Sequence, residues 1–169
     1  ALKRGLDFVL TLQGPAGQIW WARDAQGRPA TEALLTGCAS IYQSLRCGVA
    51  IAELRRDPQP GWELAAVHLG HLVARHPDRF APRDRYSMDW YYPILGGALR
   101  GTAARERLDE GWDRFVVPGL GVRCVSDRPW VTGAESAELV LALAAIGDTT
   151  RGARLLADIA HLRSPDGGY

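Results

Sequence analysis

Apolar residues recur along most of this chain at the three- and four-residue spacing of helices that bury one face. This spacing predicts seven helices, over residues 1–12, 31–54, 62–75, 93–99, 101–116, 132–146 and 149–162. Thr31 and Thr132 are expected to begin two of them, because Thr is a favoured N-cap and Thr132 to Glu135 matches the capping box. Only residues 122–125 have the composition of a strand, so the predicted fold class is all-α.

The predicted helices are of two kinds. Those beginning near residues 31, 93 and 132 are apolar and rich in small residues, whereas the others carry charge on one face. A long loop with tryptophan and carboxylate residues precedes each apolar helix, and apolar starts fall roughly 40 to 60 residues apart, as in repeats of helical pairs. We therefore expect two concentric layers, with apolar helices inside and all the long loops at one end.

Two short motifs suggest a family. Residues 13–20 (QGPAGQIW) and 164–169 (SPDGGY) resemble the Gln-x-x-Asp-Gly-x-Trp repeat of the squalene/hopene cyclase and protein prenyltransferase superfamily, with Ala16 and Tyr169 as departures from it. The resemblance implies an α/α toroid, of which residues 1–169 would be a single but incomplete domain, with an isoprenoid ligand. The resemblance does not imply the family's catalytic activity, because the chain has neither an Asp-x-Asp-Asp run nor a zinc-ligand set of Asp, Cys and His.

Composition and charge argue against several classes of function. The formal net charge is +1 and Lys3 is the single lysine, so no basic run indicates a nucleic-acid partner. The longest apolar run, residues 139–146, is too short to span a bilayer, and three cysteines without a motif argue against a disulfide framework. We expect a cytoplasmic protein of bacterial type without a metal or another cofactor.

The candidate site is the set of long loops. Residues 83–93 are the richest, with four aromatic residues, two carboxylates and two arginines. Asp89 is the first candidate for an acid or base, and Glu135 and Asp127 follow. The candidate ligand-binding residues, which can stack on a ligand or hydrogen-bond it, are Trp20, Trp21, Asp24, Arg85, Trp90, Tyr91, Tyr92, Arg123 and Trp130.

Each of these residues also has a structural interpretation. Trp90 and Tyr91 could close one end of the helical layers, an Arg–Asp pair could hold a loop, and Glu135 could serve only as a capping residue.

The residues leave the type of reaction open. The main hypothesis is a prenyltransferase-like or terpenoid-cyclase-like toroid that binds a small ligand. Because the loops are strongly polar, a carbohydrate-active toroid, either a glycoside hydrolase or a lyase, is the alternative enzyme. A non-catalytic helical-repeat scaffold is the third. The chain is expected to be a fragment whose exposed apolar edge pairs with another copy or with the remainder of the toroid.

Overall fold

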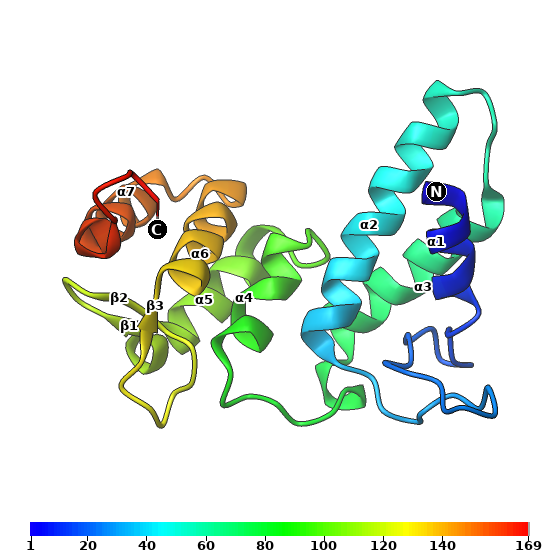
Figure 1. Cartoon of the computed structure of the whole chain (residues 1–169), viewed down its shortest axis with the longest axis horizontal. Helices are drawn as coiled ribbons and strands as arrows, with labels where there is room; N and C mark the ends of the chain where they lie inside the picture. The colour runs from blue at the N-terminus through cyan, green and yellow to red at the C-terminus, as the bar shows by residue number, and fades with distance from the viewer. Residues whose placement is uncertain (169) are drawn as a thin grey trace. The chain divides into compact units, whose positions relative to one another are not determined.

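A computed structural model describes residues 1–168. Tyr169, the predicted aromatic position of the second motif, lies outside the described residues. The chain divides into two compact units, Ala1–Pro82 and Arg83–Tyr169, and each is described by itself (Figure 1). The mainly helical class is confirmed, whereas the α/α toroid and the single domain stay predictions.

The first unit is built from three α-helices and a short 3₁₀ helix within its described residues. These are α1 (Leu2–Leu10), α2 (Leu35–Leu54), α3 (Pro60–Arg75) and η1 (Pro77–Arg79). The helix α2 packs along α3, and α1 contacts both. Buried Leu45 and Leu69 lie in this core, and the indole Nε1 of Trp62 donates a 2.9 Å hydrogen bond to Asp7 Oδ1, which ties α3 to α1.

The helix predicted from Thr31 begins at Leu35 instead, and Thr31 is no cap. The carbonyl of Glu32 accepts a hydrogen bond from the backbone N–H of Trp21, and the carbonyl of Ala33 accepts one from Ala81. This stretch therefore pairs with distant backbone as extended chain, and the first helical bond runs from the N–H of Cys38 to the carbonyl of Leu34. Tertiary pairing has overridden the local capping signal here.

The quoted motifs share one backbone turn, which also occurs a third time. The turn occurs in residues 14–18, 24–28 and 164–168. In each, the backbone N–H of the first residue donates a hydrogen bond of 2.7 to 2.9 Å to the carbonyl of the fifth residue. The fourth residue is a glycine with positive φ that donates back to the first carbonyl at 2.9 Å. The repeated sequence pattern therefore encodes a repeated local structure.

The second unit combines helices with a small sheet. Its elements are α4 (Ser87–Leu95), α5 (Gly101–Phe115), β1 (Val116–Val117), β2 (Gly121–Arg123), β3 (Val131–Thr132), α6 (Gly133–Ala145), α7 (Thr149–Asp158) and η2 (Ile159–Leu162). The strands are antiparallel in the order β1-β2-β3, with Val122 opposite both Val116 and Thr132. Only the middle strand was predicted, because β1 and β3 are too short to show a period.

The core of this unit lies where α4, α5 and α6 meet. Tyr91, Leu108, Phe115, Leu139 and Leu143 are buried there almost completely. The helix α6 leaves β3 directly, so the sheet and the first turns of α4 and α6 lie together. In Figure 1, α6 rises from the end of β3 and α4 lies to the right of the β-ribbon; these two helices pack against each other.

Residues 87–92, predicted as loop, form the beginning of α4, and Pro93 lies inside this helix instead of starting one. A proline in a helix leaves the carbonyl four residues earlier without its N–H partner. That carbonyl belongs to Asp89, and it accepts a 2.8 Å hydrogen bond from Arg107 Nη2 on α5. Arg107 Nε also donates to the carbonyl of Trp90. The arginine therefore replaces the bond that Pro93 cannot make.

No helix within residues 1–168 has both the length and the apolar character that crossing a membrane requires. The cytoplasmic location stays a prediction.

Candidate functional site

The most concentrated polar cluster of the second unit joins α4 to α6. The hydroxyl of Tyr91 donates to Glu138 Oε2 at 2.5 Å, and that of Tyr92 donates to Glu138 Oε1 at 2.8 Å. Burial and the bond to Glu138 raise the pKa of both phenols, that of Tyr92 to about 12. The phenols thus stay protonated donors at neutral pH, and the carboxylate between them is held at both oxygens.

Glu135 lies one helical turn before Glu138, in the first turn of α6. Residues three apart share a helix face, so both carboxylates lie on one side of α6. Burial acts to raise the pKa of Glu135, but hydrogen bonds from the Thr132 hydroxyl, the Cys124 thiol and its own backbone outweigh it, and the pKa is lowered. Half-buried Glu135 is thus an ionised carboxylate at the positive end of the helix dipole.

The capping box was predicted at the right place, but its bonds differ. Thr132 is the N-cap, yet its hydroxyl donates to the carboxylate of Glu135 and caps no backbone N–H. The hydroxyl of Ser136 donates to the carbonyl of Thr132 and accepts from the N–H of Val122, so α6 and the ribbon are joined by buried bonds.

Cys124 directly follows β2, and its free thiol interacts with Glu135. Burial and that carboxylate raise the pKa of the thiol to about 11, so Cys124 is a neutral donor at neutral pH. Its carbonyl accepts a bond from the N–H of Ser87, and its N–H donates to the carbonyl of Trp130. Cys124 therefore connects the start of α4 with the loop before β3.

Asp89 and Trp90 lie on the side of α4 that contacts α5. Asp89 is 8% exposed and interacts with half-buried Arg107. Burial lowers the pKa of Arg107, and the charge of Asp89 acts to raise it. The Trp90 indole stacks on Phe115 at 5.3 Å between ring centroids and donates to the carbonyl of Arg107. Of the five predicted residues on α4 and α6, the structure brings together Tyr91, Tyr92 and Glu135, and it places Asp89 and Trp90 against α5.

Arg85 and Asp127 pair with each other across two loops. Arg85 Nη2 donates to both carboxylate oxygens of Asp127, at 2.9 and 3.1 Å, and this bond holds the pKa of Asp127 below its usual value. Arg123, on β2, is half-buried, and its Nε is buried without a hydrogen-bond partner among the described residues. Trp130 projects from the loop before β3 and is 63% exposed.

The predicted residues of the first unit lie on loop 13–34. Trp20 covers Gly14 so closely that a Cβ there would meet its Cζ2 at 2.6 Å. Asp24 accepts bonds from the N–H groups of Gln26 and Arg28, which closes its own turn. Trp21 is 62% exposed.

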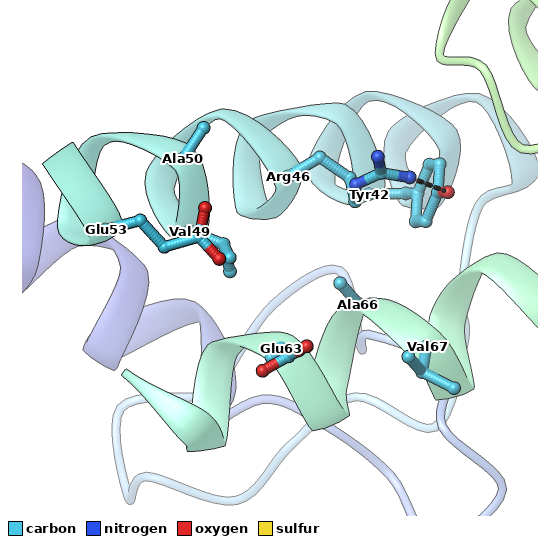
Figure 2. Close-up of a pocket in the computed structure, with 8 residues that line it drawn as sticks. All are labelled: Tyr42, Arg46, Val49, Ala50, Glu53, Glu63, Ala66 and Val67. Carbon is cyan, nitrogen blue, oxygen red and sulfur yellow. Dashed lines mark hydrogen bonds between the residues drawn. The ribbon is translucent and has the colours of Figure 1, made fainter. Parts of the chain in front are cut away.

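The first unit also contains a groove between α2 and α3, with a cavity of about 360 Å³. Figure 2 shows side chains from both helices along it, with Arg46 bonded to the Tyr42 hydroxyl at one end and Glu53 and Glu63 toward the other. None of the predicted site residues lines this groove. Residues 1–168 contain no group of three or more His, Cys, Asp and Glu side chains that could hold a metal ion.

Sequence reasoning missed Glu138. It lies three residues after Glu135 on a helix predicted to be apolar, and a second carboxylate on such a helix was an available signal. Arg107 was also missed, because nothing local to α5 indicates that its partners are the carbonyls of α4.

Comparison with known proteins gives one substantial likeness. The chain is 59% identical over 166 residues to a protein of Mycolicibacterium hassiacum named MMP endo-(1,4)-3-O-methyl-alpha-D-mannosidase. The aligned region covers 98% of this chain and 46% of that protein, so the chain spans about half the length of its relative. No protein-family model matches the chain.

This likeness overturns the predicted family. The relative is a glycosidase by name, and the resemblance to the squalene/hopene cyclase and protein prenyltransferase superfamily is therefore wrong, as are the prenyltransferase-like and terpenoid-cyclase-like descriptions. A five-residue turn with a glycine in the left-handed region produced the motif, and such turns are not specific to one family. The carbohydrate-active alternative agrees with the relative better than the main hypothesis does.

Proposed function

We propose that this chain forms part of a glycoside hydrolase that cleaves α-(1,4) bonds in oligosaccharides of 3-O-methylmannose, and that Glu135 is its general base. The identity to a protein of that name supports the substrate class. The observation that carries the catalytic assignment is a half-buried glutamate with lowered pKa in the first turn of α6, beside the Tyr91–Glu138–Tyr92 cluster.

A general base in glycoside hydrolysis takes a proton from water while the water oxygen bonds to the anomeric carbon. It must therefore be ionised at working pH, and the lowered pKa of Glu135 meets that requirement. The Thr132 hydroxyl and the Cys124 thiol orient the carboxylate as neutral donors. As the glycosidic bond breaks, its oxygen leaves with a proton from a general acid on the other side of the sugar.

Glu138 acts as a positioning residue. Both of its oxygens accept hydrogen bonds from the Tyr91 and Tyr92 hydroxyls, which fix this carboxylate in one orientation. Because Glu135 and Glu138 share one helix face, they cannot flank a sugar ring from opposite sides. The acid comes from a different segment. Asp89 lies on the α5 side of α4, and the ion pair with Arg85 lowers the pKa of Asp127, so neither is assigned this role.

Turnover of an α-(1,4)-linked 3-O-methylmannose oligosaccharide, followed by the release of reducing ends, tests the assignment. Glu135→Gln should lower kcat by roughly 10² to 10⁴, the usual contribution of a general base. Glu106→Gln, at an exposed position on α5, is the matched control and should leave kcat unchanged. If Glu135→Gln turns over the substrate at the wild-type rate, Glu135 is not the general base.

A second variant separates a base from a structural residue. Glu135→Ala leaves space for azide, which can attack the anomeric carbon without a base. Restored turnover with a glycosyl azide as product shows that Glu135 acts at the anomeric carbon, which a purely structural residue would not do. If Glu135→Ala is inactive, folded and not rescued by azide, the residue has a structural role.

A further inference from the structure

Trp130 is one of the most exposed large apolar side chains of the second unit, at 63%, and it is the last residue of the loop that joins β2 to β3. Single exposed apolar residues are common on protein surfaces, so exposure alone indicates nothing. What distinguishes Trp130 is its place in the β-ribbon relative to Glu135.

The strand register fixes that place. Thr132 on β3 lies opposite Val122 on β2, so two residues further along Trp130 lies opposite Cys124. The hydrogen bond from the N–H of Cys124 to the carbonyl of Trp130 agrees with this register. Residues directly opposite each other, and residues two apart on a strand, project to the same face of a sheet. Trp130 therefore lies on the face that also carries Cys124 and Thr132.

Both of those neighbours contact the proposed base. The Thr132 hydroxyl donates to Glu135, and the Cys124 thiol interacts with it. Two residues of extended strand separate positions by roughly 6.6 Å, about the size of one hexose ring. The backbone of residue 130 thus lies about one sugar ring from that of Thr132, whose hydroxyl holds the carboxylate of Glu135.

We propose that Trp130 is the stacking platform for the hexose ring next to the bond that Glu135 helps to hydrolyse, and that it favours O-methylated rings. This inference rests on the proposed function. One face of a pyranose is made of C–H groups, which pack on the negative π face of an indole. A methyl ether adds apolar area to that contact and removes a hydroxyl that would otherwise be desolvated.

The Arg85–Asp127 ion pair and the N–H of Ser126, which donates to the carbonyl of Arg85, fix the loop that carries Trp130. A fixed platform loses little conformational entropy when a sugar stacks on it. These contacts explain why a bulky residue can stay exposed in one place.

Calorimetric titration with a 3-O-methylmannose α-(1,4)-oligosaccharide tests the platform, in a Glu135→Gln background that slows turnover. Adding Trp130→Ala should weaken binding by about 10-fold to 100-fold, as expected when a stacked aromatic is lost. Trp130→Phe should keep most of the affinity. Phe8→Ala removes an exposed aromatic of the first unit and should change nothing.

The same titration with unmethylated α-(1,4)-mannose oligosaccharide measures specificity. The preference for the methylated ligand should shrink in Trp130→Ala. Equal affinities of Trp130→Ala and its parent would overturn the platform while the base assignment stands. If Trp130→Ala weakens binding but Glu135→Gln turns over like wild type, the base is wrong and the platform holds. A parent that binds neither sugar overturns both.

Discussion

Arg107 Nη2 donates a 2.8 Å hydrogen bond to the carbonyl oxygen of Asp89, the atom that would accept from residue 93 if that residue were not proline. The same guanidinium holds the carbonyl of Trp90 through Nε. Tyr91 and Tyr92 follow directly on α4, so this contact orients the turn that presents both phenols to Glu138. A half-buried arginine on α5 thereby supports the candidate site on the opposite side of α4.

We expect Arg107→Ala to lower the free energy of unfolding by about 3 kcal/mol, because two bonds from a charged donor are lost and the carbonyl of Asp89 is left unpaired. Pro93→Ala restores an N–H for that carbonyl. A double-mutant cycle by urea denaturation tests this. The double variant should lose at least about 1 kcal/mol less stability than the losses of the two single variants added together. Additive effects would show that Arg107 does not substitute for the missing N–H. Arg114→Ala, at an exposed ion pair, should cost little.

The sequence was sufficient for most of the helices, because their apolar spacing reflects local burial. The sequence was insufficient where contacts between distant residues determine the local structure. Residues 87–92 contain adjacent aromatics before Pro93, a pattern that predicts a loop, and they are helical because Arg107 lies within reach. Thr31 has a capping side chain, but the carbonyls of Glu32 and Ala33 are bonded to distant N–H groups.

The candidate site could be predicted as a set of residue types but not as a set of contacts. Tyr91, Tyr92 and Glu135 were named from loop composition, and they meet because α4 packs on α6. Asp89 and Trp90 come from the same run but face α5, since neighbouring helical residues point in different directions. A helix period applied to residues 87–95 would have separated the two groups.

Thr132→Val should move the acid limb of kcat/KM to higher pH. The Thr132 hydroxyl stabilises ionised Glu135, and without it burial acts to raise the pKa of Glu135 against fewer opposing bonds. The expected shift is about one pH unit or less, and Thr132→Ser, which keeps the hydroxyl, should retain the wild-type profile. A ¹³C NMR titration of the Glu135 carboxylate measures the pKa independently of turnover. An unchanged pKa in Thr132→Val would contradict the assigned contact.

Alkaline pH should destabilise the fold through Tyr91. Its phenol is buried and bonded to Glu138, so its folded pKa lies above the unfolded value of about 10. Its stabilising contribution is complete below about pH 10 and is lost as the pH rises toward the folded pKa, because only the unfolded form releases the proton. The free energy of unfolding should fall by about 1.4 kcal/mol per pH unit in this window. Urea denaturation at several pH values should give a smaller slope for Tyr91→Phe, and an equal slope would exclude this phenol.

Gly17 and Gly27 occupy the same position in two copies of the repeated turn, yet alanine should affect them differently. Both have positive φ, +100° and +78°, so either substitution costs about 1 to 2 kcal/mol in backbone strain. A Cβ at Gly17 would lie 3.0 Å from the Cβ of His68 and 3.3 Å from its carbonyl carbon, whereas nothing lies within 4 Å of one at Gly27. Gly17→Ala must therefore also displace α3, and we expect it to be more destabilising than Gly27→Ala by at least about 1 kcal/mol.

Gly5→Ala, inside α1 with nothing within 4 Å, is the opposite control and should stabilise by about 0.5 to 1 kcal/mol. Urea denaturation of the three variants gives the order directly. Equal losses at Gly17 and Gly27 would mean that the turn is free to move away from α3, and that the first motif does not anchor loop 13–34 to the helical core.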